Sequence, residues 1–419
     1  MILIRLTLFS LRNRWLSALL TIIAIALSVA LFLGVEKVRT GARVSFADTI
    51  SGTDLIVGSR TGGIQLLLYS VFRIGNATNN ITWKSYQEIA GRREVAWAVP
   101  LSLGDSHRGF RVLGTSVNYF KHYRFRGGKQ LSFAAGNPFS DLFDAVLGAD
   151  VARHLGYRMG DPIVITHGLG EVSYAEHKDK PFRVAGILAK TGTPVDRTVH
   201  VSLAAIEAIH ISWSDGARMS AMTPSAEAVR KLKLTPKAVT AMMIGVKSKL
   251  STFRLQRFIN EFAAEPLLAI LPGVALQELW DIVGTAEQAL TVVSAMVVAV
   301  AILGMTTMIL STLNERRREM AILRSVGARP ATIVGLLMTE AGLFSLFGAL
   351  LGVVLLYGGL LLARPAVDRL YGLYLPVTPP SQGELLTLVE IICAGIAISL
   401  LPALRAYRMS LADGMTIRS

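Results

Sequence analysis

The chain has 419 residues, of which 52% are hydrophobic and 17% are charged, so it is too apolar for an ordinary soluble protein and too charged for one made only of membrane spans. Its net charge of +14 could indicate a nucleic-acid partner, but the basic residues are spread through the chain or lie beside apolar segments. A nucleic-acid-binding protein more often gathers them on one element with interleaved aromatic residues, so we expect no nucleic-acid partner.

The N-terminal segment contains one candidate membrane span. Residues 1–14 carry apolar and polar side chains at helical spacing, which predicts an amphipathic helix in the inner membrane interface or a simple extension of the next helix. Residues 15–35 are long and apolar enough to cross a bilayer. A cleaved signal peptide would have a shorter apolar core and a small-residue cleavage site, which Ala30 to Glu36 lacks, so we predict a retained span.

Residues 36–284 have soluble composition and predict an external α/β domain. Its first part should contain a strand at Asp54 to Val57, a helix at Trp83 to Ala90, and two strands joined by a turn at Gly104 and Asp105. Those two strands are expected at Val95 to Leu103 and Gly109 to Gly114.

The rest of this domain divides into a β-rich part and a return to α/β patterning. Residues 125–205 hold short β-prone runs separated by Gly and Pro turns, which predict a mostly β insertion. A strand at 238–246, a helix at 253–264 and a strand at 267–271 follow. We therefore expect the first and last parts to form one small α/β subdomain with the β-rich part inserted between them.

Three more spans are predicted in the last third of the chain, at residues 285–313, 333–362 and 385–404. A basic segment at 314–332 joins the first two, a short external loop at 363–384 joins the last two, and 405–419 form a tail. The arginines that flank the spans gather at Arg5, Arg12, Arg14, Arg316, Arg317, Arg318, Arg324, Arg329, Arg405, Arg408 and Arg418. By the positive-inside rule both termini are cytoplasmic and the large domain is external. The fold class is thus an α-helical membrane protein with a large α+β extracytoplasmic domain between helices 1 and 2.

Residue patterns for catalysis are absent from the sequence. There is no G-x-x-x-x-G-K-[ST] motif and no G-x-S-x-G motif, so we expect neither ATP binding nor catalytic residues in this chain. All seven histidines fall in the external domain, but none forms an H-x₃-H pair and the single cysteine, Cys393, lies in the last span. We therefore expect surface or hydrogen-bonding histidines, no metal site and no bound cofactor.

The basic segment between the second and third spans has an ordered pattern of its own. Its charged start is followed by apolar residues at helical spacing, with Gly327 as a stop signal and Pro330 at the start of the next helix. The apolar residues are Met320, Ile322, Leu323 and Val326. This pattern favours a short helix that docks into a groove of a soluble partner, whereas a loop serving topology alone would need only the arginines.

This segment resembles the coupling segment of the FtsX-like permeases, the superfamily that includes the MacB and LolC/LolE proteins. The shared R-x-x-E-x-x-x-L-x-x-x-G-A pattern corresponds here to Arg316, Glu319, Leu323, Gly327 and Ala328. The start of the first span, the C-terminal tail and the order of one plus three spans also resemble that family. In the external domain the similarity is weaker and names no substrate.

The resemblance implies the permease subunit of an ABC transporter in a bacterial inner membrane. It implies a separate cytoplasmic ABC ATPase dimer that binds ATP and Mg, a second permease copy as homodimer or related heterodimer, membrane lipids, and a periplasmic adaptor or acceptor. The expected activity is mechanotransmission that drives export or extraction of a hydrophobic substrate such as a lipoprotein, lipid, peptide or drug-like molecule. Two alternatives stay open: an FtsX-like regulator that activates a periplasmic enzyme without transport, and a membrane-tethered binding domain without an ATPase.

Four residues in the last two spans are candidates for helix packing or function. Gly348 and Gly352 form a G-x-x-x-G pair that permits close helix approach, although such matches are common in membrane helices. Glu340 and Glu390 are the acidic residues inside these spans. Intramembrane carboxylates usually face a bundle interior or a partner, and Glu340 resembles a glutamate that recurs at this point in the family. The alternative for Glu340 is an interfacial position that stays hydrated.

Overall fold

The computed structural model of the chain describes residues 14–47, 49–167, 180–211, 213–214, 217–218, 225–315, 322, 324–371 and 377–408. The predicted N-terminal amphipathic helix, apart from residue 14, lies outside these residues. The chain divides into a membrane unit, formed by residues 1–41, 284–365 and 376–419, and an external unit, formed by residues 42–283 and 366–375.

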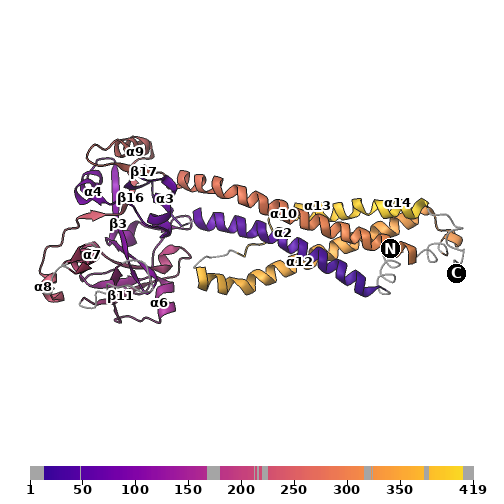
Figure 1. Cartoon of the computed structure of the whole chain (residues 1–419), viewed down its shortest axis with the longest axis horizontal. Helices are drawn as coiled ribbons and strands as arrows, with labels where there is room; N and C mark the ends of the chain where they lie inside the picture. Colours follow the sequence, from indigo (N-terminus) through magenta and orange to yellow (C-terminus); the bar gives the residue numbers. More distant parts are fainter. Residues whose placement is uncertain are drawn as a thin grey trace. The chain divides into compact units, whose positions relative to one another are not determined.

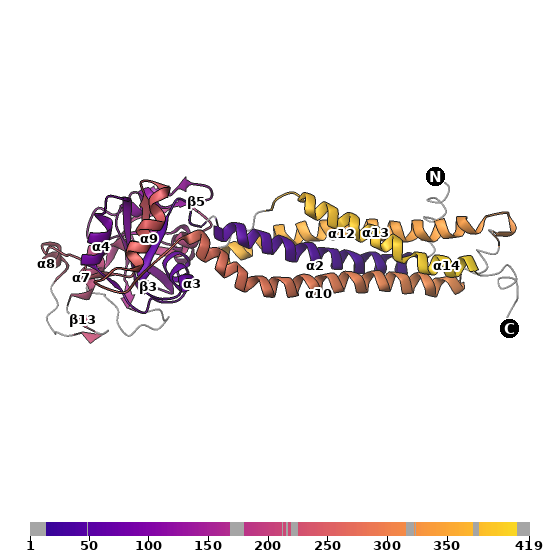
Figure 2. The same cartoon turned by 90° about the horizontal axis from the view of Figure 1, so that it is seen from above.

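Four helical segments are long and apolar enough to cross a membrane, which confirms the predicted four-span class. The helices are α2 (Trp15–Ala47), α10 (Pro272–Glu315), α12 (Pro330–Tyr371), α13 (Gln382–Ile398) and α14 (Leu400–Arg408), and the last two together make one candidate span (Figure 1). Within the membrane unit α2, α10 and α12 run side by side (Figures 1 and 2). Helices α2, α10 and α12 extend beyond the apolar stretches seen in the sequence, because hydropathy marks only the part suited to hydrocarbon.

Helices α2 and α12 pack closely in the membrane unit. A Cβ added at Gly352 would lie 2.8 Å from the Ala26 carbonyl oxygen and 2.8 Å from Val29 Cβ, and one added at Gly348 would lie 2.6 Å from Ile25 Cγ2. Since carbon atoms in contact normally stay about 3.5–4.0 Å apart, only glycine permits this approach.

One 11-stranded sheet forms the centre of the external unit, which confirms its mixed α/β class. Its main path is β17 (Leu267–Ile270), β1 (Leu55–Ser59), β16 (Ala241–Val246), β3 (Val95–His107), β4 (Phe110–Thr115), β12 (Thr198–Ser202), β8 (Asp144–Leu147), β11 (Phe182–Leu188) and β7 (Phe133–Gly136). Two short strands lie off this path, where β10 (Thr166–His167) pairs with β3 and β9 (Pro162–Ile163) pairs with β11. The pairings of β4 with β12 and of β3 with β10 join the strands of the first and last parts to those of the β-rich part.

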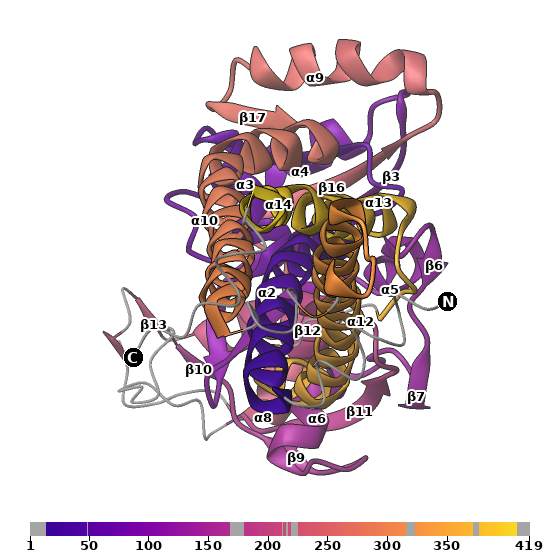
Figure 3. The same cartoon turned by 90° about the vertical axis from the view of Figure 1, so that its right-hand side faces the viewer.

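Short helices and hairpins surround this sheet (Figures 1 and 3). The helices are α3 (Gly63–Leu67), α4 (Trp83–Ala90), α5 (Asn118–His122), α6 (Ala149–Leu155), α7 (Leu203–His210), α8 (Ala226–Arg230) and α9 (Thr252–Asn260), with a π-helical turn at Leu68–Phe72 and 3₁₀ turns at Pro194–Arg197 and Lys249–Ser251. The small two-stranded pairs are β2 (Ile81–Thr82) with β15 (Ala238–Val239), β5 (Arg124–Phe125) with β6 (Lys129–Gln130), and β13 (Trp213–Ser214) with β14 (Ala217–Arg218).

The sheet separates different apolar cores because successive strand residues point to opposite faces. In β1, Leu55 and Val57 pack with α4 and α9, whereas Ile56 packs on the other face with α3. The core that contains Ile56 also includes Leu113 of β4 and Val146 of β8. It therefore extends from the first part of the domain into the β-rich part. The two parts are therefore held together by packing as well as by backbone hydrogen bonds.

The hairpin between β3 and β4 differs from the expected one. The predicted turn at Gly104 and Asp105 is wrong: β3 continues to His107, and the chain turns at Arg108 and Gly109, which have φ values of 46° and 82°. A two-residue turn with positive φ at both positions matches the twist of antiparallel strands. Gly104 and Asp105 lie instead at an irregularity in the pairing, between Leu103 and Ser106.

One histidine is part of the apolar core. His200 of β12 is fully buried against the rings of Tyr119 and Phe120, and its Nδ1 lies 3.2 Å from the Val146 carbonyl oxygen. Among the described side chains, its Nε2 is one of the buried polar atoms without a hydrogen-bond partner. Burial, together with the positive charge of Arg73, lowers the pKa of His200 to about 3 despite the contact with Val146.

We expect Gly352→Ala to destabilise the membrane unit by about 1–3 kcal/mol, because the new methyl group overlaps α2. Thermal unfolding of the detergent-solubilised chain measures this. The control is Gly359→Ala on the same helix, where an added Cβ meets no atom within 4 Å and alanine improves helix propensity by about 1 kcal/mol. Equal effects of the two substitutions would contradict the proposed contact.

We also expect His200 to make the external unit sensitive to acid. Its folded-state pKa of about 3 lies below the usual 6.5, so between these pH values the unfolded chain binds a proton that the folded chain does not. Stability therefore falls as pH decreases from 6.5 towards 3, by up to about 1.4 kcal/mol per pH unit. His200→Leu should flatten the pH dependence of the melting temperature over this range. The exposed His154 provides the control, since His154→Gln should retain the wild-type slope; an unchanged slope in His200→Leu would refute the assignment.

Candidate functional site

The predicted coupling residues are described only in part. Arg316, Glu319, Met320 and Leu323 lie outside the described residues. Gly327 has a φ of 99°, a left-handed conformation suited to glycine at the end of a helix, and its N–H donates to the Arg324 carbonyl oxygen at 3.0 Å. Ala328 is half-buried, and Pro330 begins α12. The helix end predicted at Gly327 and the helix start predicted at Pro330 are therefore both present in the structure.

Two apolar side chains of this segment are exposed. Ile322 and Val326 are 55% and 83% exposed, and the Val326 N–H donates to the Ile322 carbonyl oxygen at 3.1 Å. Residues four apart on a helical turn lie on the same face. They form a small apolar surface, which we call the coupling face, next to a basic stretch of sequence.

The two intramembrane carboxylates have different surroundings. Glu340 of α12 is only 2% exposed, beside Leu337 and Ala341 of the buried helix core, whereas Glu390 of α13 is exposed. Burial of a carboxylate within apolar helices is costly and is usually retained for packing or function. Glu340 is thus the stronger candidate of the two for a role inside the membrane unit.

A polar cluster that the sequence analysis missed links α2 to the start of α13. The Lys37 Nζ lies 3.1 Å from the Glu384 Oε1, and both side chains are 9% exposed. Glu384 also completes a capping box with Ser381, while Lys37 donates to the Thr378 carbonyl oxygen. The S-x-x-E spacing at Ser381 was a visible signal for the cap. Its pairing with Lys37 depends on packing and has no local signal.

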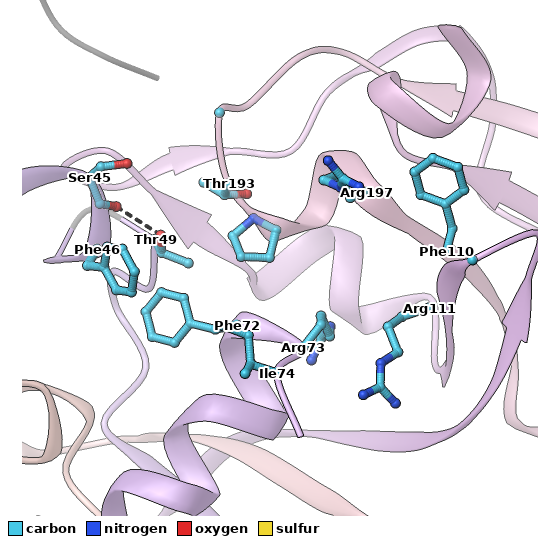
Figure 4. Close-up of a pocket in the computed structure, with 13 residues that line it drawn as sticks. Ser45, Phe46, Thr49, Phe72, Arg73, Ile74, Phe110, Arg111, Thr193 and Arg197 are labelled. Atoms are coloured by element: carbon cyan, nitrogen blue, oxygen red, sulfur yellow. Dashed lines mark hydrogen bonds between the residues drawn. The ribbon is translucent and has the colours of Figure 1, made fainter. Parts of the chain in front are cut away.

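In the external unit, a cavity of about 410 Å³ has apolar and basic walls. Figure 4 shows Phe46 and Phe72 on one side and Arg73, Arg111 and Arg197 on the other. Ile74 and Phe110 also line it. Such a lining suits a molecule with an apolar body and an anionic group.

Two arginines of this cavity, Arg73 and Arg111, form no ion pair with a carboxylate within the described part of the chain. Arg111 donates to the Asn76 Oδ1 at 2.9 Å and to the Gly75 carbonyl oxygen at 2.8 Å, and Arg73 donates to the Ser70 carbonyl oxygen. These partners are uncharged. Burial, followed by the charge of Arg73, lowers the pKa of the Arg111 guanidinium. An anion in the cavity would relieve this repulsion.

A buried aspartate fixes the loop that forms one edge of the cavity. The Asp196 carboxylate accepts hydrogen bonds from the Thr191 N–H at 2.8 Å and the Gly192 N–H at 2.6 Å. It also accepts from the Thr191 hydroxyl at 2.8 Å. Because Gly192, Thr193 and Pro194 line the cavity, these bonds hold the cavity edge in place.

Two protein-family models match the chain in sequence order. The model described as MacB-like periplasmic core domain matches residues 18–232, and the model described as FtsX-like permease C-terminal matches residues 291–411. The first covers the first span and most of the external unit, and the second covers the last three spans.

Curated relatives include the macrolide export ATP-binding/permease protein MacB of Nitrobacter winogradskyi, which is 23% identical over 347 residues, covering 80% of this chain and 49% of that protein. The protein of the same name from Chromobacterium violaceum is 26% identical over 147 residues, covering 33% of this chain and 22% of that protein. The chain thus spans about half the length of the first relative, and its match covers a smaller share of the second.

Solved structures with some similarity include the periplasmic region of MacB from Actinobacillus actinomycetemcomitans, with a TM-score of 0.34 and 10% identity, covering 55% of this chain and 94% of that one. The extracellular domain of the ABC-type transporter YknZ from Gram-positive bacteria has a TM-score of 0.31 and 11% identity, covering 52% of this chain and 98% of that one. The family-model matches extend over both units and agree with the four spans and the mixed α/β external unit. The chain therefore belongs to the family of FtsX-like permeases with a MacB-like periplasmic core domain.

Proposed function

We propose that this chain is the permease subunit of an ABC transporter that turns ATP hydrolysis by a separate cytoplasmic ATPase dimer into movement of its periplasmic domain. Permeases of this family are components of transporters, and the related MacB proteins are named as macrolide export ATP-binding/permease proteins. In this proposal ATP and Mg bind to the ATPase, both termini are cytoplasmic, and two permease copies pair in the inner membrane.

The observation that carries the proposal is the exposed coupling face of Ile322 and Val326. Large apolar side chains exposed at a chain turn favour burial against a partner. The segment lies between α10 and α12, two helices that each contribute residues to both units. A partner that moves this segment would therefore act on both helices at once.

Helix α10 provides a direct route for such movement. Its 44 residues form one helix, about 66 Å long at 1.5 Å per residue, that contributes residues 272–283 to the external unit and 284–315 to the membrane unit. Displacement of its C-terminal end is transmitted through backbone hydrogen bonds to its N-terminal end.

For the substrate we propose an apolar molecule with an anionic group, bound in the cavity of Arg73 and Arg111. The aromatic wall would contact its apolar body, and the two guanidinium groups would bind the anion. This chemistry includes acidic lipids and acylated peptides. A periplasmic adaptor or acceptor would receive the substrate after release.

Replacing both residues of the coupling face by aspartate should abolish stimulation of the ATPase. Because a hot-spot residue buried in an interface contributes about 2 kcal/mol or more to binding, Ile322→Asp with Val326→Asp should reduce the stimulated rate by about tenfold or more. The rate is measured with the ATPase that co-purifies with the full chain in lipid nanodiscs.

Leu250→Asp serves as the matched control for this experiment. Leu250 is 93% exposed in the external unit, so its replacement adds a charge without touching the coupling face. Ile322→Leu with Val326→Ile should keep the full rate. Stimulation that survives the double aspartate substitution would rule out docking at this face.

Arg111→Gln should weaken the binding of an anionic apolar probe by about tenfold or more, because a charge-assisted hydrogen bond is lost. The probe is a fluorescent fatty acid, with its uncharged primary amide as reference and empty nanodiscs subtracted. Arg158→Gln, at an exposed arginine outside the cavity, is the control variant. Equal affinities for acid and amide in the wild-type chain would remove the support for an anionic substrate.

A further inference from the structure

Three side chains that are far apart in the sequence meet on the external unit. They are Asp105 of β3, His167 of β10 and His210 at the end of α7. Asp105 and His167 lie directly opposite each other in the pairing of β10 with β3, so their Cα atoms are neighbours on the sheet. Asp105 is part of β3 because the hairpin turn lies further along the chain, at Arg108 and Gly109.

The three ligand atoms are at nearly equal distances from one another. The His167 Nδ1 lies 3.1 Å from the Asp105 Oδ1, the His210 Nε2 lies 3.5 Å from the same oxygen, and the two ring nitrogens are 3.2 Å apart. Ligand atoms about 2.0–2.1 Å from a tetrahedral zinc ion are about 3.3–3.4 Å from one another. The three atoms therefore have the spacing of three corners of such a site.

A neighbouring hydrogen bond orients one of the ligands. The His210 Nδ1 lies 2.7 Å from the Ile206 carbonyl oxygen, which can only accept, so this nitrogen carries the proton. In neutral His210 the Nε2 then has a lone pair directed at the other two atoms. A backbone acceptor behind a ligating histidine is the usual support of a metal site.

The carboxylate is suited to the same role. Asp105 is 3% exposed, and its Oδ1 lies 3.1 Å from the His167 Nδ1 and 3.5 Å from the His210 Nε2. A carboxylate beside two neutral imidazoles would offer a divalent cation one negative charge and two nitrogen ligands.

We propose that Asp105, His167 and His210 bind a divalent transition-metal ion, preferably Zn²⁺, in the external unit. Two imidazoles with one carboxylate disfavour Mg²⁺ and Ca²⁺, which prefer oxygen ligands. A cavity of about 460 Å³ is lined by all three residues, so water or a ligand entering from this cavity can supply a further ligand. The site lies apart from the arginine-lined cavity and shares no lining residue with it.

The proposal is tested by zinc titration of the full-length chain, without a histidine tag, after treatment with a chelator in detergent. A competing chromophoric chelator reports the affinity. We expect one tight Zn²⁺ per chain in the wild type, and a loss of affinity of about 100-fold or more in His167→Gln and in His210→Gln. Co²⁺ in place of Zn²⁺ should give the intense visible absorption of a tetrahedral ion.

His154→Gln is the matched control, because His154 is an exposed histidine of the same unit outside the cluster. Its zinc affinity should equal that of the wild type. The His167 side chain is 43% exposed, so its replacement should leave the metal-free melting temperature unchanged and separate loss of a ligand from loss of the fold. Wild-type zinc affinity in the His167→Gln, His210→Gln double variant, or no tight binding by the wild type, would overturn the proposal.

Discussion

The close approach of α2 to α12 is the contact on which the membrane unit depends. In a bilayer, lipid tails are as apolar as the side chains, so helices associate through packing rather than through exclusion of water. Gly348 and Gly352 let the backbone of α12 contact Ile25, Ala26 and Val29 at distances that other residues would prevent. The ion pair of Lys37 and Glu384 adds a second tie between α2 and the rest of this unit.

The external unit depends on a different principle, namely a sheet that joins segments distant in sequence. Strands from both ends of the domain lie beside one another, and the β-rich part is attached to them where β12 pairs with β4 and β10 pairs with β3. The two cavities with functional interest lie on this framework, one with arginines and aromatic rings and one with histidines and an aspartate. A rigid sheet can position both sets of side chains without a disulfide, since the chain has a single cysteine.

Local patterns were sufficient to predict the features that depend on neighbouring residues. The four spans follow from apolar length, the helix at Trp83–Ala90 follows from its periodicity, and the stop at Gly327 follows from glycine at a helix end. The hairpin turn was misplaced because Gly104 and Asp105 have strong turn propensity, whereas positive φ at Arg108 is set by the pairing around it. The position of the turn therefore depends on strand pairing and not on the turn propensity of single residues.

Contacts between distant residues could not be predicted in this way. Asp105, His167 and His210 come from two strands and a helix, so no spacing rule links them, and Lys37 and Glu384 belong to different helices. The arginine-lined cavity likewise combines the end of α2 with three separate loops and strands. Each of these groupings exists only once the sheet or the helix bundle has formed.

The continuity of α10 has a mechanical consequence. A hydrogen-bonded helix strongly resists being stretched or shortened along its axis, but it bends more easily where a residue lacks a side chain. Gly284 lies where α10 passes from one unit to the other, and a Cβ added there would meet nothing within 4 Å apart from its chain neighbours and the nearby backbone of α10. Helix α10 thus resists a push along its length, and Gly284 is one of the glycines at which it bends more easily.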